Sequence, residues 1–404
     1  MTSTDQQLDQ QLEEGQEKQA GMQPLGMTYA VQSFDKTGPM RGPYMVCTGF
    51  VRAGWNVDIL TILSDRNRDL DLAWGSVPVY KIGNGSKRNG MLRLALDMLR
   101  RRKGHITFSW VWDWHNYGSV IAKFLWGHPY ALCLDSYYYD APWDDQRFLS
   151  RLQRELRYGI AFRNADIIMG ETPSICENSK RHAPRADVLH VPNCIWLRDV
   201  EAIEQAWRAE GYAPERQPVI LFAGQVIPRK GVHDLLTAFA ELAPTFPDWR
   251  VDILGPMPDP EYGKQLRQIV QANNLQDRVS IQPSLSGEAL YRRFRACSIY
   301  CMPTYHEGIP TTILEAMYFG GAIVSGNAGF ISYQLDDGAC GLLFKGGEVS
   351  ALREHLQQLM ASPQLREQYM QCAKERMVNM FVWERYFPAI EEACKRRIAK
   401  TNAR

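Results

Sequence analysis

The sequence predicts an α/β protein of two doubly wound domains, each with a parallel sheet between layers of helices. The chain has 404 residues, which exceeds the size at which a single hydrophobic core usually stops growing. Short apolar runs typical of buried strands alternate with amphipathic helical stretches. The polar segment at 196–217 interrupts this alternation once, after which it starts again.

The first half opens with a predicted strand at 26–34, a Gly- and Pro-bearing loop, a helix at 44–54 and a strand that ends at Ser64. This order is a βαβ unit, which implies parallel strands and a right-handed crossover. Further strands are expected in the apolar runs at 77–83, 105–112, 129–135, 165–170 and 188–193.

In the second half, helices are expected from about Val232, at 264–273 and from Thr311. Strands are expected between them at 218–224, 249–255, 279–284, 298–304 and 321–326. The predicted division is a disordered tail at 1–26, an acceptor-binding domain at 27–200, a donor-binding domain at 201–380 and a helical segment at 381–404 that returns to the first domain. The tail is Gln- and Glu-rich and lacks aromatic residues, which is typical of disorder.

Composition excludes several classes of protein. Hydrophobic residues make up 45% and charged residues 23%, as in ordinary soluble proteins, and the net charge of +1 argues against a nucleic-acid binder. No run of 18 apolar residues and no signal peptide occurs, so we expect a cytoplasmic protein. The nine cysteines form no C-x-x-C pair and are expected to be buried free thiols in a reducing compartment.

The loop FAGQVIPRKGVHDLL, residues 222–236, follows a predicted strand and leads into a helix. Gly224 ends the strand, and Arg229 and Lys230 precede the helix. Adjacent cations at a helix N-terminus favour an anion such as phosphate. The alternative is a solvated Arg-Lys pair on a turn.

A second loop, YHEGIPTTILEAM, places Glu307 before a helix and Glu315 inside it. Carboxylates accept hydrogen bonds from paired hydroxyls, as sugars and riboses present them. Eight residues separate the two by roughly 12 Å if helical, wider than the roughly 5 to 9.5 Å of a glycosidase pair. The alternative makes Glu307 a helix cap and Glu315 a surface residue. A third loop, SGNAGF at 325–330, has small residues that allow the backbone to come close to a ligand.

Together, AGQVIPRKG, EGIPTTILEAM, GAIVSGNAG and DDGACGLLF resemble the C-terminal signature of retaining glycosyltransferase family four, whose members have the GT-B fold. The likeness runs through 218–345, is looser over 27–195 and includes FVW at 381–383. It implies that Glu307 contacts the donor sugar, Glu315 holds the ribose, and Arg229 and Lys230 neutralise the leaving diphosphate. The remaining donor-side residues it implies are Gly224, Leu285, Gly308, Ile309, Pro310, Thr311 and Thr312.

The chain departs from the family pattern at several positions. Gln225 stands where an arginine is frequent, Gly38-Pro39 with nearby Arg41 replaces a Gly-Gly loop, and Asp135 replaces a histidine near the reacting centre. Pro-Asn-Gly appears as PNC at 192–194. Asp135 is still expected to accept a bond from a donor-sugar hydroxyl.

Two further features concern the acceptor. Trp112 and His115 lie in an aromatic cluster, WVWDWHNYG, that suits sugar stacking or core packing. Cationic amphipathic stretches at 86–104 and 147–163 are expected either to solvate one face or to contact an anionic membrane.

The resemblance therefore implies a retaining transferase that uses a UDP-, GDP- or ADP-sugar and a hydroxyl acceptor on a small molecule, glycan or lipid. No cofactor, metal or nucleic acid is expected, and D-L-D at 69–71 is interpreted as solvated. Two alternatives remain: a sugar phosphorylase or nucleotide-sugar epimerase, and a non-catalytic nucleotide-sugar-binding protein, which Gln225 and Asp135 favour.

Overall fold

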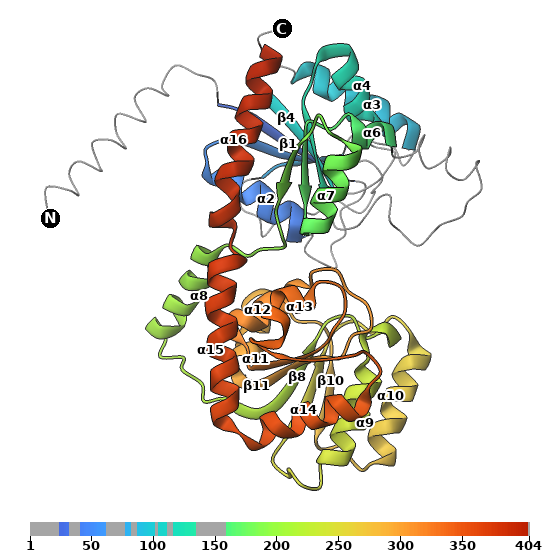
Figure 1. Ribbon diagram of the computed structural model, residues 1–404, viewed down its shortest axis with the longest axis vertical. Coiled ribbons are helices and arrows are strands. Elements are labelled where there is room, and N and C mark those ends of the chain that lie inside the picture. Colours follow the sequence, from blue (N-terminus) through green and yellow to red (C-terminus); the bar gives the residue numbers. More distant parts are fainter. Residues whose placement is uncertain are drawn as a thin grey trace, which may run out of the picture.

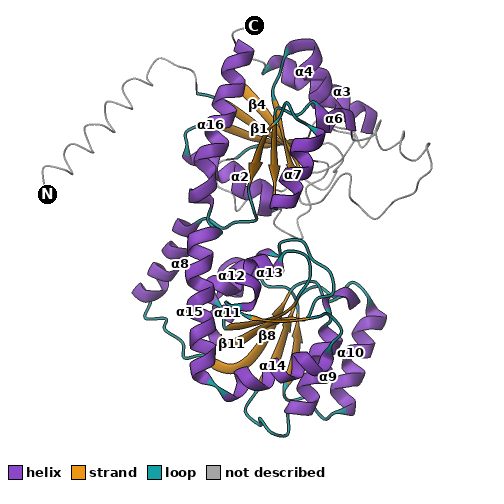
Figure 2. Ribbon diagram, in the orientation of Figure 1, coloured by secondary structure: helices purple, strands orange, loops and turns teal. Residues whose placement is uncertain are grey.

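The protein consists of two parallel sheets that lie one above the other along its long axis, with helices on both faces of each (Figure 1, Figure 2). The computed structural model describes residues 24–31, 41–61, 77–81, 87–101, 104–110, 116–134 and 159–402. The predicted two doubly wound sheets are confirmed. The predicted domain boundaries stay a prediction, and residues 1–23 of the expected tail lie outside the described part of the chain.

The first sheet has seven parallel strands in the order β3-β2-β1-β4-β5-β6-β7. Its strands are β1 (Gly26–Val31), β2 (Asn56–Thr61), β3 (Val79–Lys81), β4 (His105–Trp110), β5 (Tyr130–Leu134), β6 (Ile167–Gly170) and β7 (Asp187–His190). Its helices are α2 (Arg41–Arg52), α3 (Lys87–Arg100), α4 (Asn116–Trp126), α6 (Ile160–Arg163) and α7 (Pro173–His182).

The second sheet has six parallel strands in the order β10-β9-β8-β11-β12-β13. Its strands are β8 (Gln217–Ala223), β9 (Arg250–Leu254), β10 (Val279–Gln282), β11 (Cys297–Met302), β12 (Ala322–Gly326) and β13 (Leu342–Phe344). Its helices are α8 (Leu197–Ala209), η3 (Pro228–Lys230), α9 (Val232–Leu242), α10 (Pro260–Ala272), α11 (Gly287–Ala296), α12 (Thr311–Phe319), α13 (Ile331–Gln334), η4 (Asp336–Gly338) and α14 (Val349–Ala361).

The apolar runs became strands because helices cover both faces of each sheet. Every residue of β5, β11 and β12 is buried, so these strands carry no alternating polar face. Two features differ from the sequence prediction. The polar segment at 196–217 contains helix α8, whose Trp207 packs into the core under the second sheet. The short strand β13 was not expected, because its three residues are too few for a periodicity to show.

The last two helices, α15 (Pro363–Met380) and α16 (Trp383–Asn402), lead the chain from the second sheet back to the first (Figure 1). Helix α15 packs on α12, whereas α16 contacts α2, β4 and β7. Apolar side chains of α16, including Trp383, Phe387 and Ile390, belong to the core of the first half. The C-terminal helix therefore closes one face of the first sheet.

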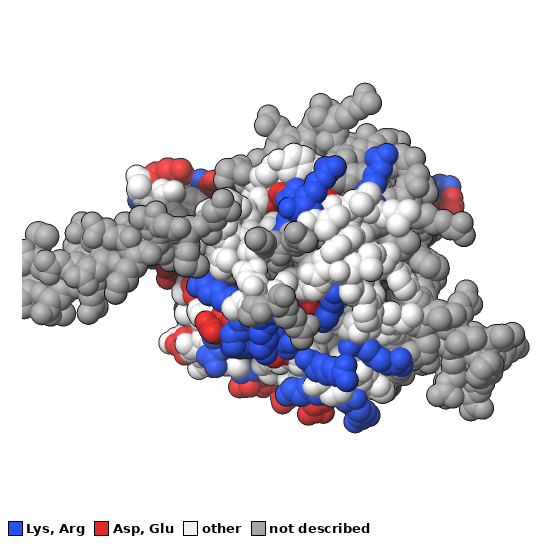
Figure 3. Space-filling model, turned by 90° about the horizontal axis from the view of Figure 1, so that it is seen from above, with Lys and Arg blue, Asp and Glu red and all other residues white. Residues whose placement is uncertain are grey.

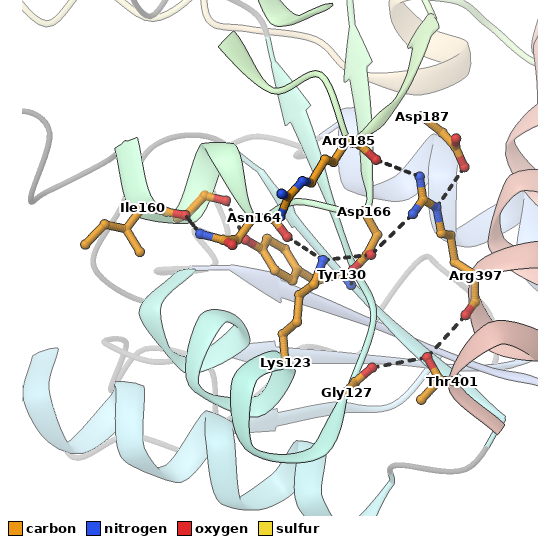
Figure 4. Close-up of polar contacts among 11 residues, drawn as sticks. Lys123, Gly127, Tyr130, Ile160, Asn164, Asp166, Arg185, Asp187, Arg397 and Thr401 are labelled. Carbon is orange, nitrogen blue, oxygen red and sulfur yellow. Dashed lines mark hydrogen bonds and ion pairs between the residues drawn. The ribbon is translucent and has the colours of Figure 1, made fainter. Parts of the chain in front are cut away.

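A polar network fastens the far end of α16 to the first sheet (Figure 4). Arg397 donates to the Asp187 carboxylate at 2.8 Å and to the Arg185 carbonyl at 3.0 Å, and it lies 3.7 Å from Asp166. Lys123 of α4 pairs with the same Asp166 carboxylate at 2.7 Å. Burial alone would raise the pKa of Asp187, but hydrogen bonding and charge, first from Arg397 and then from Arg396, outweigh it and lower that pKa.

Two of the nine cysteines are not free, which corrects the sequence prediction. Cys340 and Cys372 form a disulfide that joins the segment before β13 to helix α15, with their Cα atoms 5.1 Å apart. The pair is 32 residues apart in sequence, so no local spacing indicated it. The other seven cysteines are free and buried, as expected.

We predict that Arg397→Ala lowers the free energy of unfolding by about 2 kcal/mol, because it leaves partly buried Asp187 and Asp166 short of a cation. Arg396→Ala is the matched control, since Arg396 is half exposed and lies 3.6 Å from Asp187. Arg396→Ala should change the free energy of unfolding by less than about 0.5 kcal/mol. Urea unfolding followed by tryptophan fluorescence measures both, and equal losses would contradict the role given to Arg397.

Candidate functional site

The order of strands in the second sheet reverses between β8 and β11. Strands β8, β9 and β10 follow one another in one direction, and β11, β12 and β13 in the other. Loops that leave the carboxyl ends of two such strands diverge and open a crevice, where α/β proteins bind ligands. Residues 224–231 follow β8, 303–310 follow β11 and 327–330 follow β12. The structure thus brings the three loops predicted from sequence to one edge of one sheet.

The first loop must come very close to the second. Gly231 has φ of 67°, in the left-handed region, and a Cβ atom there would lie 1.9 Å from the Pro303 carbonyl oxygen. Any other L residue would therefore push the loop with Arg229 and Lys230 away from the loop after β11. The Tyr305 amide donates to the Arg229 carbonyl at 2.9 Å, which joins the two loops directly.

Lys230 and Glu307 form the centre of the site. The Lys230 ammonium donates to Glu307 Oε1, and the two side chains are only 12% and 10% exposed. The hydroxyl of buried Thr304 donates to the same oxygen at 3.1 Å. Arg229 lies 3.6 Å from it, is half exposed, and donates to the His306 carbonyl at 2.9 Å. A largely buried carboxylate is thus compensated by one buried cation, one hydroxyl and one outer cation.

The third loop holds the backbone around Glu307. Gly329 has φ of 58°, and a Cβ atom there would lie 2.0 Å from the Glu307 carbonyl oxygen. The Phe330 amide donates to the Gly308 carbonyl at 3.2 Å. A Cβ atom on Gly308 itself would meet nothing within 4 Å, so the space beside this residue is open. The small residues at 325–330 therefore allow close contact with the backbone at 307–308, and their approach to a ligand stays a prediction.

Helix α12 begins beside this open space. Pro310 occupies its cap position and Thr311 is its first residue, as expected for a proline at a helix start. Two amide side chains fix the preceding carbonyls: Asn193 donates to Ile309 at 2.7 Å, and buried Gln334 donates to Pro310 at 3.2 Å. Glu307 is therefore not the cap of this helix, which rules out that alternative.

Glu315 is 2% exposed within α12, so it is not a surface residue. It lies near Tyr300 of β11, whose pKa is raised first by burial and further by the charges of Glu315 and Glu307. A hydrogen bond to Thr312 acts in the opposite direction. Both carboxylates predicted from sequence therefore act on one buried phenol beneath the start of α12.

The other donor-side residues lie at the same edge. Gly224 follows β8 and has φ of 155°, and Gln225 beside it is exposed. Leu285, between β10 and α11, is partly buried against the core of the second sheet. Nothing in the geometry assigns a ligand contact to Leu285, so its role stays a prediction.

The acceptor-side predictions concern the first sheet, whose strand order reverses between β1 and β4. Gly38, Trp112, His115 and Asp135 lie outside the described residues, as does the side chain of Arg41, the first residue of α2.

Sequence reasoning missed three residues of the site: Thr304, Asn193 and Tyr300. Thr304 ends the strand segment three residues before Glu307, which was a usable signal. Asn193 lies in the PNC segment, of which only the third residue, a cysteine in place of the family's glycine, was interpreted. Tyr300 had no signal, because it is one aromatic residue among the apolar residues of β11.

Residues 203–376 match the family model described as "Glycosyl transferases group 1". An uncharacterized glycosyltransferase of Haemophilus influenzae is 29% identical over 40% of this chain and 44% of its own length. A D-inositol 3-phosphate glycosyltransferase of Streptomyces avermitilis is 28% identical over 44% of this chain and 40% of its own length. The chain thus spans less than half the length of these curated relatives.

Solved structures match nearly the whole chain. A sucrose-phosphate synthase from Thermosynechococcus elongatus superposes with a TM-score of 0.68 at 20% identity, covering 93% of this chain and all of that one. The Anabaena protein HepE in complex with UDP gives a TM-score of 0.70 at 17% identity, covering 92% of this chain and 99% of that one. The chain therefore has the GT-B fold, and the part that matches the glycosyltransferase group 1 model, residues 203–376, contains the Lys230–Glu307 pair.

Proposed function

We propose that this protein is a retaining glycosyltransferase that moves a sugar from a nucleotide-diphosphate sugar to a hydroxyl acceptor without a metal ion. The observation that carries the proposal is the buried Lys230–Glu307 pair at the crevice between β8 and β11, beside the start of α12. Structural neighbours of this fold that hold UDP or UDP-glucose support a nucleotide-sugar donor.

On the donor side, the diphosphate lies between Lys230, Arg229 and the first turn of α12. Cations and helix N-termini both stabilise phosphate oxygens, and this crevice offers the two together. Glu307 accepts hydrogen bonds from the donor sugar in the open space beside Gly308, and Glu315 accepts them from the ribose. Leu285 lies against the base.

The chemistry follows from the charge that develops on the departing diphosphate. Lys230 is paired with Glu307 before the donor binds, so it turns from the carboxylate to the diphosphate as the donor enters. Positioned cations in a site that excludes water stabilise such charge strongly. The acceptor hydroxyl attacks from the face on which the diphosphate leaves, and a donor phosphate oxygen takes its proton.

The acceptor binds to the first domain, near the reversal of strand order between β1 and β4. The proposed residues there are Gly38, Arg41, Trp112 and His115, and Asp135 faces the donor sugar. Closure of the two halves around both substrates then excludes water from the reacting bond.

The first prediction concerns the donor. UDP at about 100 times its dissociation constant should stabilise the protein by roughly 2.7 kcal/mol and raise its melting temperature by about 2 °C or more. GDP and ADP, assayed in parallel by thermal shift, identify the base. If the protein is incubated with UDP-glucose and no acceptor, formation of an epimer without release of UDP would contradict the transferase proposal. Because no metal ion is proposed, addition of EDTA should leave the transfer activity unchanged.

The second prediction separates the two partners of the central pair. Lys230→Ala should weaken UDP binding about tenfold or more, because a buried cation beside the diphosphate is lost. Glu307→Gln should leave UDP affinity unchanged or higher, because it removes a negative charge and releases Lys230, yet it should abolish sugar transfer. Calorimetry and a transfer assay measure the two effects.

Lys264→Ala is the control for this pair of variants, because Lys264 forms an exposed ion pair with Glu261 on α10. It should change neither UDP affinity nor transfer. Full transfer by Glu307→Gln, or equal weakening of UDP binding by both site variants, would contradict the proposed roles.

We also propose that helices α3 and α4 contact an anionic membrane. These helices pack side by side and expose Leu92, Leu96, Phe124 and Leu125, with exposed fractions of 52%, 54%, 69% and 64%. The segment KRNGMLRLALDMLR of α3 carries four cations and one acid. Figure 3 looks onto the end of the molecule where α16 finishes, and more blue Lys and Arg than red Asp and Glu are visible there among the white residues. No helix in the described part of the chain has the length and apolarity needed to cross a bilayer.

The third prediction tests this surface. Vesicles with an anionic lipid should sediment the wild-type protein more than neutral vesicles do, and Phe124→Ser with Leu125→Ser should reduce that binding about tenfold. Val51→Ser, on α2, is the control for a lost exposed apolar side chain. Equal sedimentation of all proteins would contradict membrane contact. If the wild-type protein is a dimer and the double variant is a monomer, the surface is instead an interface with a second copy of the chain.

A further inference from the structure

A chain of polar side chains links α10, α9 and the loop after β11, next to the proposed donor site. The Tyr262 hydroxyl of α10 lies 2.8 Å from Nδ1 of His233, and Nε2 of His233 lies 3.2 Å from the Tyr305 hydroxyl. The Tyr305 hydroxyl donates to Oδ2 of Asp234 at 2.6 Å. None of these residues has a role in the donor contacts described above.

The hydrogen bonds of this chain have one consistent direction. The His233 backbone amide donates to the Tyr262 oxygen at 3.3 Å, which leaves the Tyr262 hydrogen for Nδ1 of the ring. We assign Nδ1 as the acceptor of this bond and Nε2 as the donor to Tyr305. Burial, together with the Asp234 bond, raises the pKa of Tyr305, and burial raises that of Tyr262 to about 12, so both phenols keep their protons.

The position of this chain relative to the central pair gives it a role. His233 and Asp234 lie in the first turn of α9, three and four residues after Lys230. Tyr305 lies two residues before Glu307, and its ring stacks on His233 with centroids 6.1 Å apart. The chain therefore ties the turn that carries Lys230 to the loop that carries Glu307.

We propose that Tyr305 is a positioning residue of the donor site: through His233 and Asp234, its hydroxyl holds the Arg229-Lys230 turn in line with Glu307. This inference rests on the proposed function. It adds that donor affinity depends on a phenol that does not touch the donor. Asp234 is 6% exposed, so its carboxylate depends on Tyr305 and His233 rather than on water for its hydrogen bonds at this face.

The first experiment needs no donor. Nitrogen-15 NMR of histidine-labelled protein should show His233 as the neutral Nε2–H tautomer, and Tyr305→Phe should shift its ring signals. The same variant should speed amide hydrogen exchange at 304–308 more than in the strands of the second sheet, because the lost bond is local to that loop. A ring protonated on Nδ1, or unchanged exchange at 304–308, would overturn the inference whether or not UDP binds.

The second experiment measures UDP affinity. Tyr305→Phe, which keeps the stacked ring, should weaken UDP about tenfold. Asp234→Asn should weaken it less, and the double variant should be no weaker than Tyr305→Phe alone, because the two residues act through one bond. Additive losses or an unchanged affinity would overturn the inference. Failure of wild-type protein to bind UDP would count against the proposed donor instead.

Tyr318→Phe is the matched control. Its hydroxyl also donates to a carboxylate, Glu204, at 3.3 Å, but it does so at the other end of α12. The variant removes a similar bond and should leave UDP affinity and exchange at 304–308 unchanged.

Discussion

The contact between Lys230 and Glu307 is the interaction on which the rest of the site depends. It is possible only because β8 and β11 are neighbours and their loops leave the same edge of the sheet. Gly231 allows the loops to touch, and Thr304 adds a neutral donor to the carboxylate. A buried ion pair gains little net stability once its desolvation is counted, so stability alone does not account for its presence. The proposed binding of a diphosphate at this site would account for it.

Much of the fold, and the meeting of the three loops at one edge of the second sheet, could be predicted from the sequence because the signals are local. Buried parallel strands appear as short apolar runs, and the turn before Lys230 and the loop at Glu307 each occupy a few consecutive residues. Asn193, Tyr300 and the Cys340–Cys372 disulfide could not be predicted in the same way. Each acquires its role through a neighbour that is distant in sequence: Asn193 and Ile309 are 116 positions apart, and the two cysteines are 32 positions apart. Such pairings depend on the finished sheet order.

The two halves differ in how they are completed. The helices that cover the second sheet are close in sequence to its own strands, whereas the first sheet is completed by α16 from the C-terminal end of the chain. Trp196, just after the first half, stacks on Trp383 of α16 with ring centroids 6.1 Å apart. The segment that connects the halves and the C-terminal helix α16 are therefore packed against each other. A displacement of one must displace the other.

This packing gives the position of the first sheet a direct effect on the donor site. Asn193 lies just beyond β7 of the first sheet, yet its amide donates to the Ile309 carbonyl, directly before the start of α12. A rotation that moves β7 away from α12 must break this 2.7 Å bond. The turn that presents the first amides of α12 is thus held from both sides, by Asn193 of the first half and by Gln334 of the second. Binding in one half can in this way change the geometry of the proposed anion site in the other, with no hinge residue required to carry the signal.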